Sequence, residues 1–155
     1  MERSVQVLCM IHKHPYILLG MKKRGFGKGR WNGFGGKVKE GETVDDAVCR
    51  ELKEESGLDA IHLQKHGIIE FEFPHDDFLI EGHIYRCEHY EGELIESDEM
   101  IPKWFHVNEL PFESMWQDDQ HWINYLLDEK FFKARFVFDE GDNILEKHVE
   151  LVDSL

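Results

Sequence analysis

The segment that decides the fold spans residues 36–58 and reads GKVKEGETVDDAVCRELKEESGL. Thr43 is a residue type that accepts a backbone N–H at a helix N-terminus, and Asp46 follows three residues later, as in a capping box. Gly57 supplies the left-handed residue that commonly ends a helix. These signals predict one helix of about four turns between Thr43 and Gly57.

Three glutamates share one face of this predicted helix. Glu51, Glu54 and Glu55 are spaced i, i+3 and i+4, which makes them neighbours on the helix surface. Carboxylates this close repel one another, so a bare stripe would weaken the helix. A hard divalent cation removes the repulsion, and Mg²⁺ takes oxygen ligands while keeping water and substrate phosphates in its shell. A solvated acidic face is the alternative, and the fixed glycines and Arg50 around the stripe count against it.

The spacing of these residues resembles the signature of the Nudix hydrolase family. That signature is a glycine, five residues, a glutamate, seven residues, Arg-Glu, an aliphatic residue, one residue, Glu-Glu, one residue, a glycine and an aliphatic residue, and every fixed position is present. The resemblance implies an α/β/α sandwich with a mixed sheet and two main helices. It also implies a substrate built on a nucleoside diphosphate, and Mg²⁺ as cofactor with Mn²⁺ as a possible substitute.

The same resemblance implies a role for each charged residue of the segment. The implied metal ligands are the Gly36 carbonyl, Glu51, Glu54, Glu55 and Glu99, while Arg50 would orient the glutamates through an ion pair and Glu42 would support Arg50. One glutamate should take a proton from the attacking water. Glu55 and Glu99 are both candidates for that base.

The resemblance reaches beyond the signature to one branch of the family, the animal MutT homologues that hydrolyse oxidised purine nucleoside triphosphates. It is carried by residues 20–27, 29–37, 40–43 and 96–100, with Trp116, Asp118 and Asp119. The implied substrates are 8-oxo-dGTP and 2-hydroxy-dATP, cleaved to monophosphate and pyrophosphate. The residues implied to line the substrate site are Lys22, Phe26, Asn32, Phe34, Gly35, Gly36, Lys37, Phe71, Phe73, Met100, Trp116, Gln117, Asp118 and Asp119.

Three positions depart from that branch. Val7 stands where the branch has a pocket threonine, Ile80 where it has a methionine, and Gln117 where it has a proline. These departures leave the preferred base open but do not touch the phosphate chemistry. Considered without the resemblance, the aromatic residues of the implied pocket would be interpreted as core, and the run of basic residues 22–24 as a surface patch.

Asp118 and Asp119 are adjacent carboxyls next to Trp116, in what the resemblance implies is an apolar pocket. Burial and mutual repulsion raise the pKa of one of them, so that it stays protonated and donates a hydrogen bond while its neighbour accepts. Oxidation changes the donor and acceptor pattern on the edge of a purine. We therefore predict that this pair reads the oxidised base.

The charge of the chain limits its partners. Its 155 residues include 32 acidic and 18 basic side chains, for a net charge of −14. This charge opposes binding to nucleic acid polymers and to anionic membranes. A small nucleotide is also an anion, so lysines or bound cations must reverse the potential locally.

The length and composition suit one domain over residues 1–155. No apolar run of eighteen residues and no basic-then-apolar leader is present, and Cys9, Cys49 and Cys87 have no paired spacing. We expect a cytoplasmic monomer with free thiols. The expected strands are residues 5–11, 16–21, a short one near 34, 67–73, 78–87, 104–107, 131–138 and 144–152, with a second helix over 117–129.

Two other functions stay open on these grounds. The first is hydrolysis of another diphosphate, such as a dinucleoside polyphosphate, by the same chemistry. The second is a nucleotide-binding module without catalysis, which the complete set of Glu51, Glu54 and Glu55 disfavours.

Overall fold

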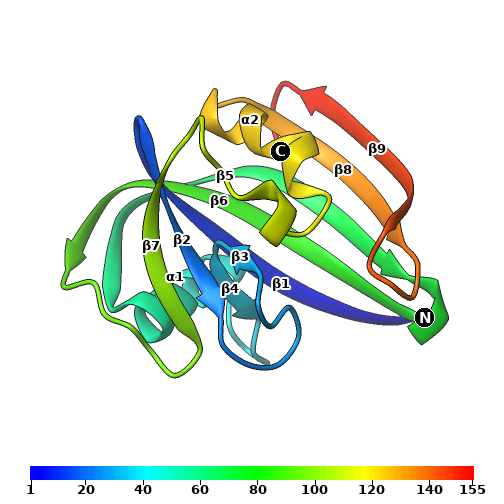
Figure 1. Cartoon of the computed structure of the whole chain (residues 1–155), viewed down its shortest axis with the longest axis horizontal. Coiled ribbons are helices and arrows are strands. Elements are labelled where there is room, and N and C mark those ends of the chain that lie inside the picture. Colours follow the sequence, from blue (N-terminus) through cyan, green and yellow to red (C-terminus); the bar gives the residue numbers. More distant parts are fainter.

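The computed structural model describes residues 1–155 and contains two helices packed on a nine-stranded mixed sheet (Figure 1). Neither helix is long and apolar enough to cross a bilayer. The helices are α1 Val44–Ser56 and α2 Asp119–Leu127, with short 3-10 turns η1 Pro74–Asp76 and η2 Phe112–Ser114. The strands are β1 Glu2–Lys13, β2 Tyr16–Lys22, β3 Trp31–Asn32, β4 Phe34–Lys37, β5 Leu58–Phe73, β6 Phe78–Gly92, β7 Met100–His106, β8 Phe131–Phe138 and β9 Ile144–Val152.

Strand β1 organises the sheet, whose order is β3-β2-β1-β6-β5-β8-β9. It runs parallel to β6, and β5 runs parallel to β8, while the other pairs are antiparallel. Along its other edge β1 pairs with β4 at Gln6 to Cys9 and with β2 only at Ile11 to Lys13. The sheet therefore opens beside the first half of β1, and β4 enters the opening.

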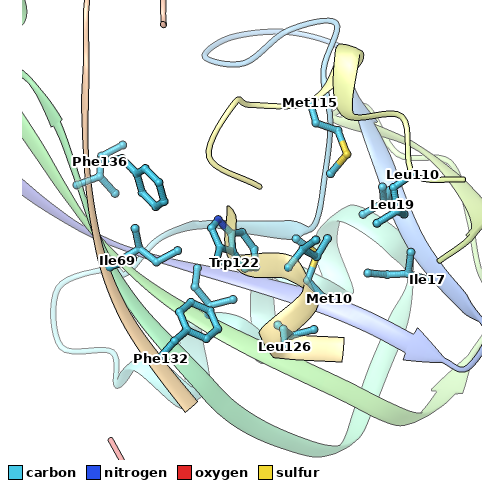
Figure 2. Close-up of a cluster of buried hydrophobic side chains, with 14 of the residues drawn as sticks. Met10, Ile17, Leu19, Ile69, Leu110, Met115, Trp122, Leu126, Phe132 and Phe136 are labelled. Carbon is cyan, nitrogen blue, oxygen red and sulfur yellow. The ribbon is translucent and has the colours of Figure 1, made fainter. Parts of the chain in front are cut away.

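Each face of the sheet carries its own core, because successive side chains of a strand point to opposite faces. Met10 belongs to the cluster that contains Trp122 and Leu126 of α2, which Figure 2 shows. Cys9 belongs to the cluster that contains Leu52 of α1. In Figure 1, α2 lies over β8 and α1 lies beside β4. The predicted α/β/α sandwich with a mixed sheet is confirmed.

Helix α1 begins and ends where the sequence predicts. The Thr43 side chain accepts the N–H of Asp46 at 3.1 Å. Gly57 adopts φ 81°, a left-handed conformation that glycine adopts without penalty, and its N–H bonds to the Lys53 carbonyl. Ala47, Val48 and Leu52 are buried together with Glu55 and Ser56, so the carboxylate stripe begins at the buried face of the helix and extends toward solvent.

Several strands are longer than predicted. Strand β5 begins at Leu58 rather than near residue 67, and β6 continues to Gly92 rather than ending at residue 87. These two strands pair over their whole lengths, with irregularities between Ala60 and His62 and between Lys65 and Gly67. Cross-strand pairing thus extends both strands beyond the part with a regular apolar pattern. Helix α2 is shorter than residues 117–129.

A buried polar network ties β1 to β6 and reaches Glu129, just after the end of α2. Arg86 Nε donates to His12 Nδ1 at 3.0 Å, and His12 Nε2 lies 3.3 Å from His14 Nδ1. Because Nδ1 of His12 accepts, Nε2 carries the single ring proton. Burial, followed by the charge of Arg86, lowers the pKa of His12 to about 4. The native state therefore holds this histidine neutral.

This network should make the protein less stable in mild acid. The pKa of His12 in the folded protein lies below its unfolded value of about 6.5. Its contribution to the free energy of unfolding is therefore present above pH 6.5 and is lost as the pH falls toward 4. The loss between pH 7 and pH 5 should be about 2 kcal/mol. His12→Asn keeps an acceptor for Arg86 without titrating and should remove that part of the pH slope. Urea unfolding at several pH values measures it; the exposed His148→Asn should leave the slope unchanged, and an unchanged slope in His12→Asn would contradict the assignment.

Candidate active site

The site begins where β4 passes close to α1. A Cβ atom at Gly35 would lie 1.8 Å from the Val7 carbonyl oxygen, and one at Gly36 would lie 2.7 Å from the Glu51 carboxyl carbon. A side chain at Gly35 would clash with the β1 backbone, and one at Gly36 would displace the Glu51 carboxylate. The two glycines therefore let the β4 backbone approach both β1 and the carboxylates of α1.

Arg50 holds the acidic groups around it. Its guanidinium donates twice to Glu42, at 2.7 and 3.0 Å, and also to Glu51 at 2.8 Å and Glu54 at 3.2 Å. A further bond at 3.0 Å reaches the Lys37 carbonyl at the end of β4. The Arg50 hydrogen bond lowers the pKa of Glu42 to about 2. Arg50 thus fixes helix, loop and strand to one another, a placement that suits the orienting role implied for it.

Glu55 is the buried member of the carboxylate stripe. It is only 3% exposed, and its Oε1 accepts the Gly35 N–H at 2.8 Å. Burial raises the pKa of Glu55 to about 8, and burial also raises the pKa of Glu51. A carboxylate removed from water in this way is strongly stabilised by a nearby cation.

Glu99 stands just before β7, close enough to Glu55 for its charge to affect the pKa of that residue. It accepts from Lys22 Nζ at 3.3 Å and from Arg24 Nε at 2.9 Å, and the Arg24 bond lowers its pKa. Glu51 and Glu54 are thus bonded to Arg50, and Glu99 is bonded to Lys22 and Arg24. In this arrangement no group of three acidic, histidine or cysteine side chains is placed to bind one metal ion. These ion pairs must rearrange if the glutamates are to share a metal.

A cavity of about 500 Å³ extends from Glu55 to the start of α2. Among the residues predicted for the substrate site, its lining includes Lys22, Phe26, Asn32, Gly35, Gly36, Lys37, Phe71, Phe73, Met100, Trp116, Asp118 and Asp119. Phe34 instead lies in the core beneath α1, and Gln117 lies outside the cavity. Two lysines at the carboxylate end supply local positive charge within an acidic protein.

Asp118 and Asp119 lie at the other end of this cavity, each 2% exposed. Asp118 is the N-cap residue of α2, yet its carboxyl makes no capping bond and accepts from Trp122 Nε1 at 2.8 Å. Oδ2 of Asp119 has no partner. Burial raises the pKa of Asp118 to about 6, and burial together with the charge of Asp118 raises the pKa of Asp119 well above its usual range. The pair therefore offers one acceptor and one protonated donor near neutral pH.

Aromatic rings line the same end of the cavity. The Trp116 ring lies 5.1 Å from Phe26 and 6.2 Å from Phe73, measured between ring centroids. The side-chain oxygen of Asn32 accepts the Gly33 N–H at 2.9 Å, which leaves its amide hydrogens free to donate. Flat apolar walls with a few fixed polar groups are typical of a site for a nucleobase.

Six residues that the sequence did not single out also line the cavity: Gln6, Leu8, Phe78, Gly82, Ile84 and Trp122. Trp122 could have been found from its i+4 spacing to Asp118, which puts both on one face of the helix. Gln6, Val7 and Leu8 are consecutive residues of β1 and all line the cavity, so the alternation of strand faces could not predict this lining.

Comparison with known proteins agrees with this geometry. The family model described as the NUDIX domain matches residues 2–126. The chain is 48% identical over 147 residues to the oxidized purine nucleoside triphosphate hydrolase of Mus musculus, covering 95% of this chain and 94% of that protein. It is 51% identical over 148 residues to the protein of the same description from Danio rerio, covering 96% and 95%.

A crystal structure of a MutT protein from Bacillus halodurans superimposes with a TM-score of 0.85 at 22% identity, over 95% of this chain and 97% of that chain. At that identity the likeness speaks for the fold. The carboxylate helix and the glycine cradle of β4 agree with the family match over most of the chain. That match shows that this chain belongs to the Nudix family.

Proposed function

We propose that this protein hydrolyses nucleoside triphosphates that carry an oxidised purine, such as 8-oxo-dGTP and 2-hydroxy-dATP, to the monophosphate and pyrophosphate. The observation that carries the proposal is one cavity with two unlike ends. The carboxylate of Glu55 lies at one end, and the Asp118 and Asp119 pair lies at the other. The two relatives that are about half identical along nearly the whole chain are described as hydrolases of such nucleotides.

Mg²⁺ is part of the proposal, with Mn²⁺ as a substitute. Glu51, Glu54, Glu55, Glu99 and the Gly36 carbonyl would hold it. The fit rests on hard oxygen donors, on the glycine cradle against Glu51 and on the buried carboxyl of Glu55. When bound, the ion would neutralise the phosphates and acidify water.

The residues of the chain would divide the remaining work. Lys22 and Lys37 line the carboxylate end and would bind phosphate oxygens. Water would attack the β-phosphorus, the bond from that phosphorus to the oxygen bridging the α-phosphate would break, and Glu55 or Glu99 would accept the proton of the water. Arg50 would keep Glu51 and Glu54 in place through the bonds described above.

A nucleotide panel tests the proposal. Pyrophosphate release is measured with 8-oxo-dGTP, 2-hydroxy-dATP, dGTP, dATP and a dinucleoside polyphosphate, each with Mg²⁺ and with EDTA. We expect the two oxidised purines to have the highest kcat/KM, and activity to disappear in EDTA. Equal kcat/KM for oxidised and normal purines, or preference for the dinucleoside polyphosphate, would contradict the proposal.

The alternatives retain less support. Neither of the two relatives with high identity is described as acting on dinucleoside polyphosphates. A module without catalysis does not explain why Glu55 is buried in the cavity wall. The proposal also includes that the protein is a cytoplasmic monomer. It would act on free nucleotides rather than on nucleic acid polymers or at membranes.

A further inference from the structure

Trp116 has a neighbour on the side away from the cavity. The guanidinium carbon of Arg30 lies 4.0 Å from the centroid of the Trp116 ring, within the range of a cation–π contact. Arg30 does not line the cavity that Trp116 lines; it lines a separate shallow hollow together with Gln117, Asp142 and Asn143. Arg30 therefore supports the indole from outside the cavity.

Arg30 is itself held by the turn between β8 and β9. Its Nη1 donates to Asp142 Oδ2 at 3.1 Å, and both side chains are about one-third exposed. The position of Asp142 is fixed by the turn, because Asp139 Oδ1 accepts the N–H groups of Gly141 and Asn143 at 2.9 Å each. The ion pair thus connects Trp116, through Arg30, to an ordered hairpin.

Gln117 makes a second connection to the same turn. Its Nε2 donates to Asn143 Oδ1 at 2.7 Å, and its Oε1 accepts the Ile144 N–H at 2.9 Å. Gln117 directly follows Trp116 in the chain. A proline at this position could make neither bond, so the departure of this sequence from the related branch creates the connection.

We propose that Arg30 and Gln117 are positioning residues that transmit the position of the β8–β9 turn to Trp116, and so set how tightly the site binds the base. The proposal rests on the proposed function for the identity of the ligand. A flat ring stabilises a stacked base only while its plane is held, and a ring that must be ordered on binding contributes less. Trp116 is remote from the phosphates, so loosening it should weaken binding without slowing the chemical step.

The test uses three variants and one control. Arg30→Met removes the guanidinium but keeps an apolar side chain, Asp142→Asn releases Arg30 while leaving its charge in place, and Gln117→Pro removes both hydrogen bonds. Arg135→Met is the control. Arg135 of β8 also pairs with carboxylates, with Glu72 at 3.0 Å and Glu146 at 3.2 Å, but it does not line the cavity. Steady-state kinetics with 8-oxo-dGTP are measured for each variant, together with the NMR signal of the Trp116 indole N–H.

We expect KM to rise about 10-fold in Arg30→Met and a few-fold in Asp142→Asn and Gln117→Pro, with kcat within about twofold, since uniform binding is lost. The indole signal should shift and broaden in these variants and not in Arg135→Met. An unchanged indole signal with unchanged KM in all three variants would overturn the proposal. An effect confined to Arg30→Met would also overturn it. The charge of Arg30, which also acts on Asp118, would then explain the change in KM without any role for the turn.

The two proposals fail in different ways. If the wild-type protein released no pyrophosphate from oxidised purine nucleotides, the proposed function would fall. The indole signal of the variants needs no turnover and would still decide whether Arg30 and Gln117 position Trp116.

Discussion

Glu55→Gln is expected to lower kcat by on the order of 100-fold or more, because one charged ligand of the proposed Mg²⁺ is lost while the shape of the side chain is kept. Glu54→Gln should have a similar effect. Folding should survive in Glu55→Gln, since burial already penalises the charge of Glu55 and a neutral amide removes that penalty. Initial rates of pyrophosphate release, with thermal unfolding measured in parallel, give both quantities.

The control for this prediction is an exposed glutamate outside the site. Glu109→Gln makes the same chemical change at an exposed position that does not line the cavity, and it should keep full activity. Activity of the wild type should vanish in EDTA and return when Mg²⁺ is added in excess. Near-normal kcat in both Glu54→Gln and Glu55→Gln, or full activity in EDTA, would mean that these carboxylates hold no catalytic metal.

The second large effect is expected at the far end of the cavity. Asp118→Asn and Asp119→Asn should each lower kcat/KM for oxidised purines by roughly 5- to 150-fold, the cost of leaving one buried polar group unpaired. The two variants should change the ratio of 8-oxo-dGTP to 2-hydroxy-dATP unequally, because Asp118 accepts from Trp122 whereas Asp119 has a free oxygen. Kinetics with both substrates and with dGTP measure the ratios.

These variants should lose activity without losing stability. The pKa values of both carboxyls are higher in the folded protein than in the unfolded chain. Their contribution to the free energy of unfolding is therefore complete below the unfolded pKa of about 3.9 and is lost as the pH rises through about 6. An amide at either position removes that loss, and unfolding at pH 7.5 should be no easier than in the wild type. Asp128→Asn, at the exposed C-terminal end of α2, is the matched control. Unchanged substrate ratios in both variants would place base recognition elsewhere.

The sequence predicted those parts of the molecule whose signals are local. Helix α1 follows from its cap at Thr43 and its stop at Gly57, and the carboxylate stripe follows from helical spacing. The N-terminal half of β5 has no regular apolar pattern and becomes strand because β6 pairs with it. A partner that is distant in the chain cannot be inferred from local periodicity.

The same limit applies to the site. Phe34 belongs to the core although its neighbours Gly35 and Gly36 line the cavity, because its side chain packs beneath α1 while the two glycines have no side chain and present their backbone to the cavity. The sequence also could not show that Gln117 points toward the β8–β9 turn, since both of its partners lie more than twenty residues later. Resemblance names the residues of a site, and only packing shows the direction in which each one faces.

The strand β1 constrains how this molecule can change over time. Its alternate side chains belong to opposite cores, since Met10 packs in the cluster of Trp122 while Cys9 packs under α1, and both Leu8 and Val7 reach the cavity. A one-residue insertion within β1 would exchange these duties along the rest of the strand and damage ligand binding and folding together. The β8–β9 hairpin, by contrast, lies beyond residues 2–126 that match the family. A change in the length of its turn would leave the register of β1 intact.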